Sequence, residues 1–167
     1  MKLVLLGMFT VIAAFGQKIE IEADQTVDFS KFRTFAVRQG RLNSKNPSLN
    51  SELIRKRIHA DIERYLGARG LESAGNGPAD LNVRYTLGAV RTNEIETYPA
   101  GWRGWGTRVV RVPYTEGTLV IDLRDARAHS LVWRAIAREE NSNASKIEAK
   151  LDDMVRKSCE KYPPRMK

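Results

Sequence analysis

The residues that could support acid–base catalysis are Asp122, Asp125 and His129. A hydrolase or transferase needs a nucleophile, a base and an orienting acid, but neither G-x-S-x-G nor H-E-x-x-H occurs in the chain. Asp122 lies in the apolar run TLVIDL, where it can instead pair with Arg134 of a neighbouring strand. Asp125 is typical of a turn, and Trp133 alternates with apolar residues and is predicted to lie in the core. A structural Asp122–Arg134 pair is the favoured interpretation, and a small hydrolase or transferase is the alternative.

Metal and cofactor chemistry has little support in the composition. Cys159 is the single cysteine, which excludes an internal disulfide framework and any multi-cysteine zinc or iron–sulfur site. His59 and His129 are the only histidines, and the glycines of GWRGWG lack the K-[ST] ending of a phosphate-binding loop. We therefore predict no metal and no cofactor. Cys159 falls beside an apolar helical stripe, which favours a buried thiol. An intermolecular disulfide is the alternative in an oxidising compartment.

One segment combines aromatic residues with arginine. Trp102, Arg103 and Trp105 lie in the sequence YPAGWRGWGTR. Tryptophan and arginine on a loop favour recognition of a partner protein, a sugar face or a membrane interface. The alternative is a β-hairpin extension whose tryptophans pack on the sheet.

Basic charge is concentrated in another segment. The chain has 167 residues, with 28 Lys+Arg against 20 Asp+Glu and a formal net charge of +8, and residues 31–70 alone are net +7. This segment contains Arg55, Lys56 and Arg57 on a predicted helix. Such a patch attracts nucleic acid, anionic lipid or acidic wall polymer. The triplet is therefore a second candidate binding site, and a solvated helix face is its alternative.

The N-terminal residues predict export. Met1 and Lys2 precede the apolar run LVLLGMFTVIAAF, and a small residue follows it. This is the layout of a secretory signal peptide, and the run is shorter than the roughly 20 residues that a membrane-spanning helix needs. We expect residues 1–16 to be a signal peptide and residues 17–167 to form one domain without a transmembrane span. We expect the product in the periplasm or outside the cell, with no cysteine for lipoprotein acylation. Export disfavours nucleic acid as a partner.

Hydrophobic periodicity predicts the elements that position these residues. Alternating apolar residues predict strands at residues 18–23, 32–38, 81–89, 109–112, 118–123 and 131–137. Helical spacing predicts one helix from Ser48 or Asn50 to about Arg69, and a second over residues 145–162. The polar stretch 38–48 and the Gly- and Trp-rich stretch 92–108 are predicted loops. This order predicts an α+β fold, in which a mostly antiparallel sheet of about four to six strands has two helices packed on one face. The result is a two-layer sandwich.

Several segments together resemble a known family. They are DFSKFRTFAV at residues 28–37, GPADLNVRY at 77–85, YTEGTLVIDLRDA at 114–126, LVWRAIA at 131–137 and the YPP that ends the last helix. In this order they resemble the bacterial domain of unknown function 4136 family over nearly the whole mature chain. The resemblance implies an exported cell-envelope protein, often a lipoprotein, with an α+β fold, and it implies no catalytic residues. Together with the charge pattern, it predicts a non-enzymatic binding or structural module that contacts a protein or an anionic envelope component.

Overall fold

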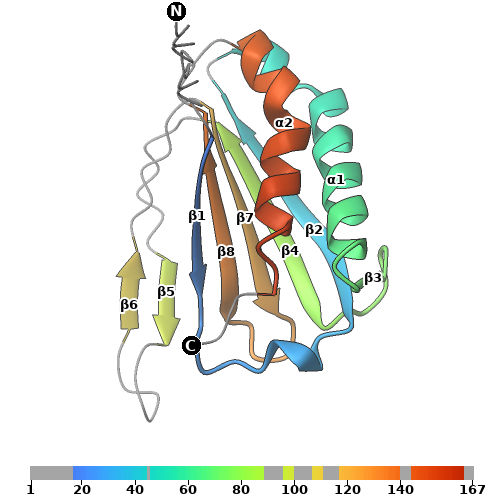
Figure 1. The fold of residues 1–167 in the computed structure, drawn as a ribbon, viewed down its shortest axis with the longest axis vertical. Coiled ribbons are helices and arrows are strands. Elements are labelled where there is room, and N and C mark those ends of the chain that lie inside the picture. The colour runs from blue at the N-terminus through green and yellow to red at the C-terminus, as the bar shows by residue number, and fades with distance from the viewer. Residues whose placement is uncertain are drawn as a thin grey trace, which may run out of the picture.

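The computed structural model describes residues 17–44, 46–88, 96–99, 107–110, 117–139 and 144–163. The predicted signal peptide lies outside these residues. Within them, two α-helices cover one face of a six-stranded sheet (Figure 1). The strands of this sheet are β1 (Lys18–Ala23), β2 (Thr34–Asn43), β3 (Glu72–Ser73), β4 (Leu81–Gly88), β7 (Thr118–Asp125) and β8 (Leu131–Arg138). The helices are α1 (Glu52–Gly67) and α2 (Ala144–Cys159). The α+β fold and its two-layer arrangement are confirmed.

The sheet is mixed rather than mostly antiparallel. Its strand order is β1-β8-β7-β4-β2-β3, and β1, β8, β7 and β4 pair antiparallel. Strand β2 pairs parallel with both β4 and β3. The reason is α1, which connects β2 to β4 as a crossover helix, because parallel neighbours need a long connection of this kind. The sequence pattern predicted this order of strand, helix and strand. The prediction of a mostly antiparallel sheet did not take into account that such a connection favours parallel pairing.

Strand β2 is longer than predicted and replaces most of the loop expected at residues 38–48. Its pairing register with β4 shifts between Val37 and Gln39, which marks a β-bulge. The bulge changes the phase of the alternation, so the second half of the strand does not continue the pattern of the first. Gly40 in that half lies against the Tyr85 ring, where an added Cβ would lie 2.1 Å from the ring Cζ. A glycine in a strand is a feature of such close approaches.

The helices form where their apolar stripes meet the sheet. Helix α1 begins after Ser51, rather than at Ser48 or Asn50, and the Ser51 side chain accepts a hydrogen bond from the Ile54 backbone N–H. Its buried face contains Ile54, Ile58, Ile62 and Leu66. Helix α2 ends at Cys159 rather than at residue 162. The residues predicted for its apolar stripe are all buried, five of them on α2 and Tyr162 beyond its end: Ile147, Leu151, Met154, Val155, Ser158 and Tyr162. Neither described helix is long and apolar enough to cross a membrane.

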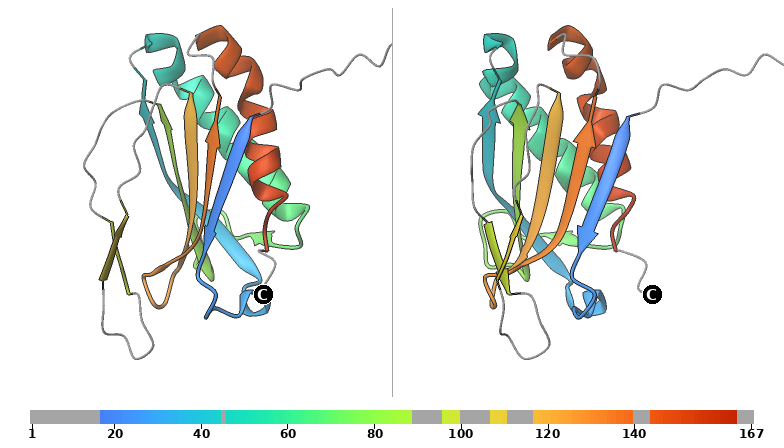
Figure 2. Two further views of the ribbon diagram at one scale, coloured as in Figure 1. Left: turned by 60° about the vertical axis from the view of Figure 1, so that its left-hand side comes forward. Right: turned by 90° about the vertical axis from the view of Figure 1, so that its left-hand side faces the viewer.

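The chain segment between β4 and β7 forms a second, two-stranded sheet. It consists of β5 (Glu96–Pro99) and β6 (Thr107–Val110), which pair antiparallel. The predicted loop at 92–108 therefore contains a strand, and the strand predicted at 109–112 begins earlier. Figure 2 shows this hairpin on the side of the main sheet opposite the two helices. We call that side the helix-free side.

Candidate functional site

Asp122 and Arg134 form the cross-strand pair that the sequence suggested. Arg134 Nε donates to Asp122 Oδ1 at 2.6 Å, and Arg134 Nη2 donates to Asp122 Oδ2 at 2.7 Å. The two residues are direct neighbours on β7 and β8, with Arg134 1% and Asp122 8% exposed. Trp133, next to Arg134, is fully buried in the core on the helix side. Because both carboxylate oxygens are engaged by a guanidinium, Asp122 is poorly placed to act as a general base.

This pair is the centre of a row of alternating charges on the helix-free side. Glu22 on β1 lies opposite Arg134, and Arg84 on β4 lies opposite Asp122. Opposite charges that face each other across neighbouring strands stabilise a sheet. The row therefore joins four strands and gives Asp122 a structural role.

The other two candidate catalytic residues lie in the turn between β7 and β8. Asp125 Oδ1 accepts hydrogen bonds from the backbone N–H groups of Arg127 at 2.7 Å and Ala128 at 3.0 Å. His129 is exposed and has a φ of 54°. Asp125 therefore has the turn role predicted for it, and the fold does not gather Asp122, Asp125 and His129 around one concave site. Among the described residues, no three His, Cys, Asp or Glu side chains are grouped to hold a metal ion.

The basic triplet on α1 divides into one structural and two exposed residues. Arg55 Nη1 donates to the Gly40 carbonyl oxygen, and Arg55 Nε lies 3.2 Å from Glu52 Oε2. Lys56 and Arg57 are exposed on the outer surface of the helix. Arg55 therefore ties α1 to β2, and its two neighbours, Lys56 and Arg57, are exposed to solvent.

The basic segment 31–70 does not form a single patch. Arg38 on β2 donates to Asn82 Oδ1 at 2.9 Å, on the helix-free side of the sheet. Lys56 and Arg57 are on α1, which belongs to the opposite, helical layer (Figure 2). A charge that is local in sequence is thus distributed over two faces of the molecule.

Trp102, Arg103 and Trp105 lie outside the described residues. The last register pair of the β5–β6 hairpin is Pro99 with Thr107, so the segment that joins the two strands contains all three residues. The strands that flank this segment, β5 and β6, form a hairpin, as the alternative interpretation predicted. Whether the tryptophans bind a partner or pack on the sheet stays a prediction.

The remaining reactive side chains have ordinary structural positions. Cys159 has no exposed surface, and burial raises the pKa of its thiol to about 12. The buried-thiol prediction is confirmed, and a thiol at this position does not reach a second chain while the domain stays folded. His59 is on α1, with Nε2 3.7 Å from Glu63 Oε1.

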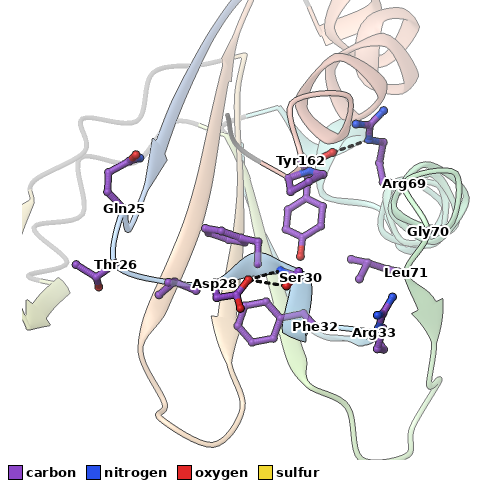
Figure 3. A pocket seen from close by; sticks show the side chains of 13 residues that line it. Gln25, Thr26, Asp28, Ser30, Phe32, Arg33, Arg69, Gly70, Leu71 and Tyr162 are labelled. Carbon is purple, nitrogen blue, oxygen red and sulfur yellow. Dashed lines mark hydrogen bonds between the residues drawn. The ribbon is translucent and has the colours of Figure 1, made fainter. Parts of the chain in front are cut away.

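The structure also contains a cavity that the sequence analysis missed. Its volume is about 700 Å³, and it lies between the turn after β1, the end of α1 and the end of α2 (Figure 3). Its apolar lining includes Phe29, Phe32, Leu71 and Tyr162, and its basic lining consists of Arg33 and Arg69. No sequence motif indicated it, because residues near positions 30, 70 and 162 meet only after folding.

Tyr162 is the central aromatic residue of this cavity. Its ring meets those of Phe29 and Trp133 edge-to-face, at centroid distances of 5.8 and 6.0 Å. Tyr162 is 2% exposed, and its hydroxyl has no hydrogen-bond partner within the described part of the chain. Burial raises the pKa of this hydroxyl to about 12, so it stays protonated at neutral pH. Figure 3 shows the side chain pointing from the end of α2 toward Ser30 and Leu71.

The charged groups around the cavity differ in the hydrogen bonds that they make to the rest of the protein. Arg69 Nε donates to the Tyr162 carbonyl oxygen, which holds the guanidinium beside the cavity. The Arg33 guanidinium has no hydrogen bond or ion pair to any described residue. Asp28 Oδ1 accepts from the Ser30 hydroxyl at 2.6 Å and the Ser30 backbone N–H at 3.0 Å. These bonds lower the pKa of Asp28, the hydroxyl bond most strongly.

Comparison with known families gives one match over most of the chain. The sequence profile of the family described as Domain of unknown function (DUF4136) matches residues 19–164. Among curated proteins, none matches the chain.

Several solved structures share the fold at low sequence identity. A DUF4136 family protein from Bacteroides thetaiotaomicron is 17% identical with a TM-score of 0.60, and the match covers 88% of this chain and 96% of that one. A PDZ domain protein from Parabacteroides distasonis is 18% identical with a TM-score of 0.53, over 89% of this chain and 35% of that one. The PelC dodecamer from Paraburkholderia phytofirmans is 12% identical with a TM-score of 0.52, over 86% of this chain and 94% of that one. At these identities the likeness concerns the fold alone.

Proposed function

Because the chain belongs to the domain of unknown function 4136 family, whose name assigns no activity, we propose a function from its geometry. The protein is an exported, non-enzymatic binding module of the cell envelope. It contacts an anionic envelope component through the helix-free side of its sheet. The proposal rests on the hydrogen bonds that the candidate catalytic carboxylates already make. Asp122 is engaged by Arg134, and Asp125 is engaged by its turn.

The charge of the helix-free side supports an anionic partner. By strand alternation, basic side chains outnumber acidic ones on this side. Apart from the buried Asp122–Arg134 pair, the basic residues are Lys18, Arg38, Arg41, Arg84, Arg124 and Arg138, and the acidic ones are Glu20 and Glu22. Strands β5 and β6, between which Trp102 and Trp105 lie in the sequence, are on this same side (Figure 2). Basic charge beside aromatic residues suits the headgroup level of an anionic membrane.

Vesicle sedimentation tests this proposal. The protein should bind vesicles that contain phosphatidylglycerol, should bind neutral phosphatidylcholine vesicles weakly, and should release as salt rises, because salt screens exposed charges. Trp102→Ala with Trp105→Ala, and separately Arg84→Gln, should weaken binding. Lys56→Gln removes one charge from the helical side and serves as the matched control.

The outcome of this experiment also separates the alternatives. Equal binding to neutral vesicles, or no effect of salt, contradicts an anionic lipid partner. If Lys56→Gln is as damaging as Arg84→Gln, the contact lies on α1. Crosslinking in intact cells identifies a partner protein where vesicles do not bind.

Export has its own test. The chain should be recovered outside the cytoplasm, with an N-terminus at Gln17, since residues 1–16 have the layout of a signal peptide. Recovery of exported protein that still begins at Met1 would show that the signal peptide is not cleaved.

A further inference from the structure

The Tyr162 hydroxyl is a buried polar group that the fold leaves without a partner. Buried hydroxyl groups in native proteins are almost always hydrogen-bonded, because burial without a partner loses the bonds they make to water. Tyr162 Oη has no such bond within the described residues, and neither does the buried Nε1 of Trp133, whose ring contacts the Tyr162 ring. Two neighbouring side chains therefore lack a polar partner at the same place in the fold.

The cavity beside Tyr162 carries an excess of positive charge. Two basic residues, Arg33 and Arg69, line it together with one acidic residue, Asp28. Asp28 Oδ1 is already bound to Ser30, and Arg69 is held in place through its Nε by the Tyr162 carbonyl. The other nitrogens of Arg69 and the whole guanidinium of Arg33 are bound to no described residue. Arginine in this state is suited to a carboxylate, which its planar fork binds with two hydrogen bonds.

The rest of the lining combines apolar side chains with the polar residues Gln25, Thr26 and Ser30. Phe29 and Phe32 meet edge-to-face at a centroid distance of 6.1 Å, and Leu71 lies on the facing wall (Figure 3). A cavity of about 700 Å³ is within the size range of small-molecule sites, which are mostly apolar with a few converging polar groups.

We propose that this cavity binds a small amphiphilic carboxylate. The apolar body of the ligand packs against Phe29, Phe32 and Leu71. Its carboxylate pairs with the guanidinium of Arg33, and Arg69 adds positive charge beside the Tyr162 carbonyl.

In this arrangement the Tyr162 hydroxyl donates a hydrogen bond to a carboxylate oxygen. The bond supplies the partner that the hydroxyl otherwise lacks. This site is separate from the helix-free side of the sheet, so it can be correct whether or not the protein binds anionic vesicles.

Calorimetry and fluorescence test the proposal with defined probes. Decanoate represents an acyl carboxylate, naphthoate represents an aromatic one, and decanol is the neutral match to decanoate. Titrations are run below the micelle concentration. In a Trp102→Phe, Trp105→Phe background, Trp133 is the single remaining tryptophan and reports decanoate binding beside Tyr162 by its fluorescence. At least one carboxylate should bind, and decanol should bind more weakly than decanoate.

Two variants separate binding from structure. Tyr162→Phe removes only the hydroxyl, so it should lower carboxylate affinity by about tenfold. It should not lower the thermal stability of the ligand-free protein, because the lost hydroxyl makes no bond to a described residue. A purely structural role for the hydroxyl predicts the reverse, with lower stability and unchanged affinity.

Arg33→Gln should lower decanoate affinity by about tenfold and remove the preference over decanol. Lys56→Gln is the matched control for charge, and should change neither. The proposal is overturned if neither carboxylate binds, if decanol binds as tightly as decanoate, or if both cavity variants retain wild-type affinity.

Discussion

Removing one member of the Asp122–Arg134 pair should cost a large share of the stability of this domain. We consider Asp122→Asn, which keeps the shape of the side chain and removes its charge. Arg134 is 1% exposed, so its guanidinium would lose its bidentate anion without gaining water. Breaking a buried ion pair in this way costs about 3–5 kcal/mol. Since natural domains are stable by roughly 5–15 kcal/mol, the variant should be close to unfolding.

Urea unfolding followed by circular dichroism measures this effect. The midpoint should fall strongly with little change in the slope, because the surface exposed on unfolding is the same. Thermal midpoints should fall by about 6–20 °C, from about 2–4 °C per kcal/mol for a chain of this size. Lys18→Gln is the surface control. Its ion pair to Glu20 is 2.9 Å long, with side chains 71% and 39% exposed, and should contribute less than about 1 kcal/mol.

A double variant tests whether the cost arises from the unpaired charge. Asp122→Leu with Arg134→Met replaces the pair by apolar side chains and leaves no buried charge behind. This variant should recover most of the stability lost by Asp122→Asn, since apolar replacement of a buried ion pair is often neutral or stabilising. If Asp122→Asn costs less than about 1 kcal/mol, the pair is effectively solvated and this reasoning is wrong.

Three further predictions follow from the packing. Gly40→Ala would bring Cβ to 2.1 Å from the Tyr85 ring, so urea unfolding should show a loss of about 1–3 kcal/mol; an unchanged midpoint would show that the ring moves freely. The Cys159 thiol, with its pKa raised to about 12 by burial, should react with a thiol reagent only after denaturation, and rapid labelling of the native protein would contradict its burial. Burial and then the charge of Asp152 raise the pKa of Asp61. The stability that an acid with a raised pKa contributes is present when it is protonated and is lost as pH rises through that pKa. Asp61→Asn should therefore increase stability at neutral pH but not in acid, as measured by urea unfolding, and a loss at neutral pH would show that the charged form is the stabilising one.

The sequence predicted the features that depend on near neighbours in the chain. The five predicted stripe residues that lie on α2 are all buried, because helical spacing determines which side chains share a face, whereas Tyr162 is buried beyond the end of the helix. The Asp122–Arg134 pair was predictable for a related reason. The two residues lie on strands joined by a short turn, and a hairpin brings opposite positions together at a separation that the turn sets.

The sequence left open the features that depend on how distant segments meet. The bulge after Val37 concealed half of β2, since one extra residue reverses the alternation on which strand prediction relies. The sequence also did not indicate that the basic charge of residues 31–70 is divided between two faces of the molecule. The division arises because β2 and α1 belong to different layers.

The carboxylate cavity proposed here depends wholly on tertiary structure. The hydrophobic periodicity predicted correctly that Tyr162 is buried. It does not indicate which polar groups surround the buried hydroxyl. The surroundings of the hydroxyl depend on the turn at Phe29 and on Leu71, four residues after the end of α1. Both are far from Tyr162 in sequence and close only in the fold. Burial of a side chain follows from local pattern, whereas satisfaction of its polar atom depends on the atoms that packing places around it.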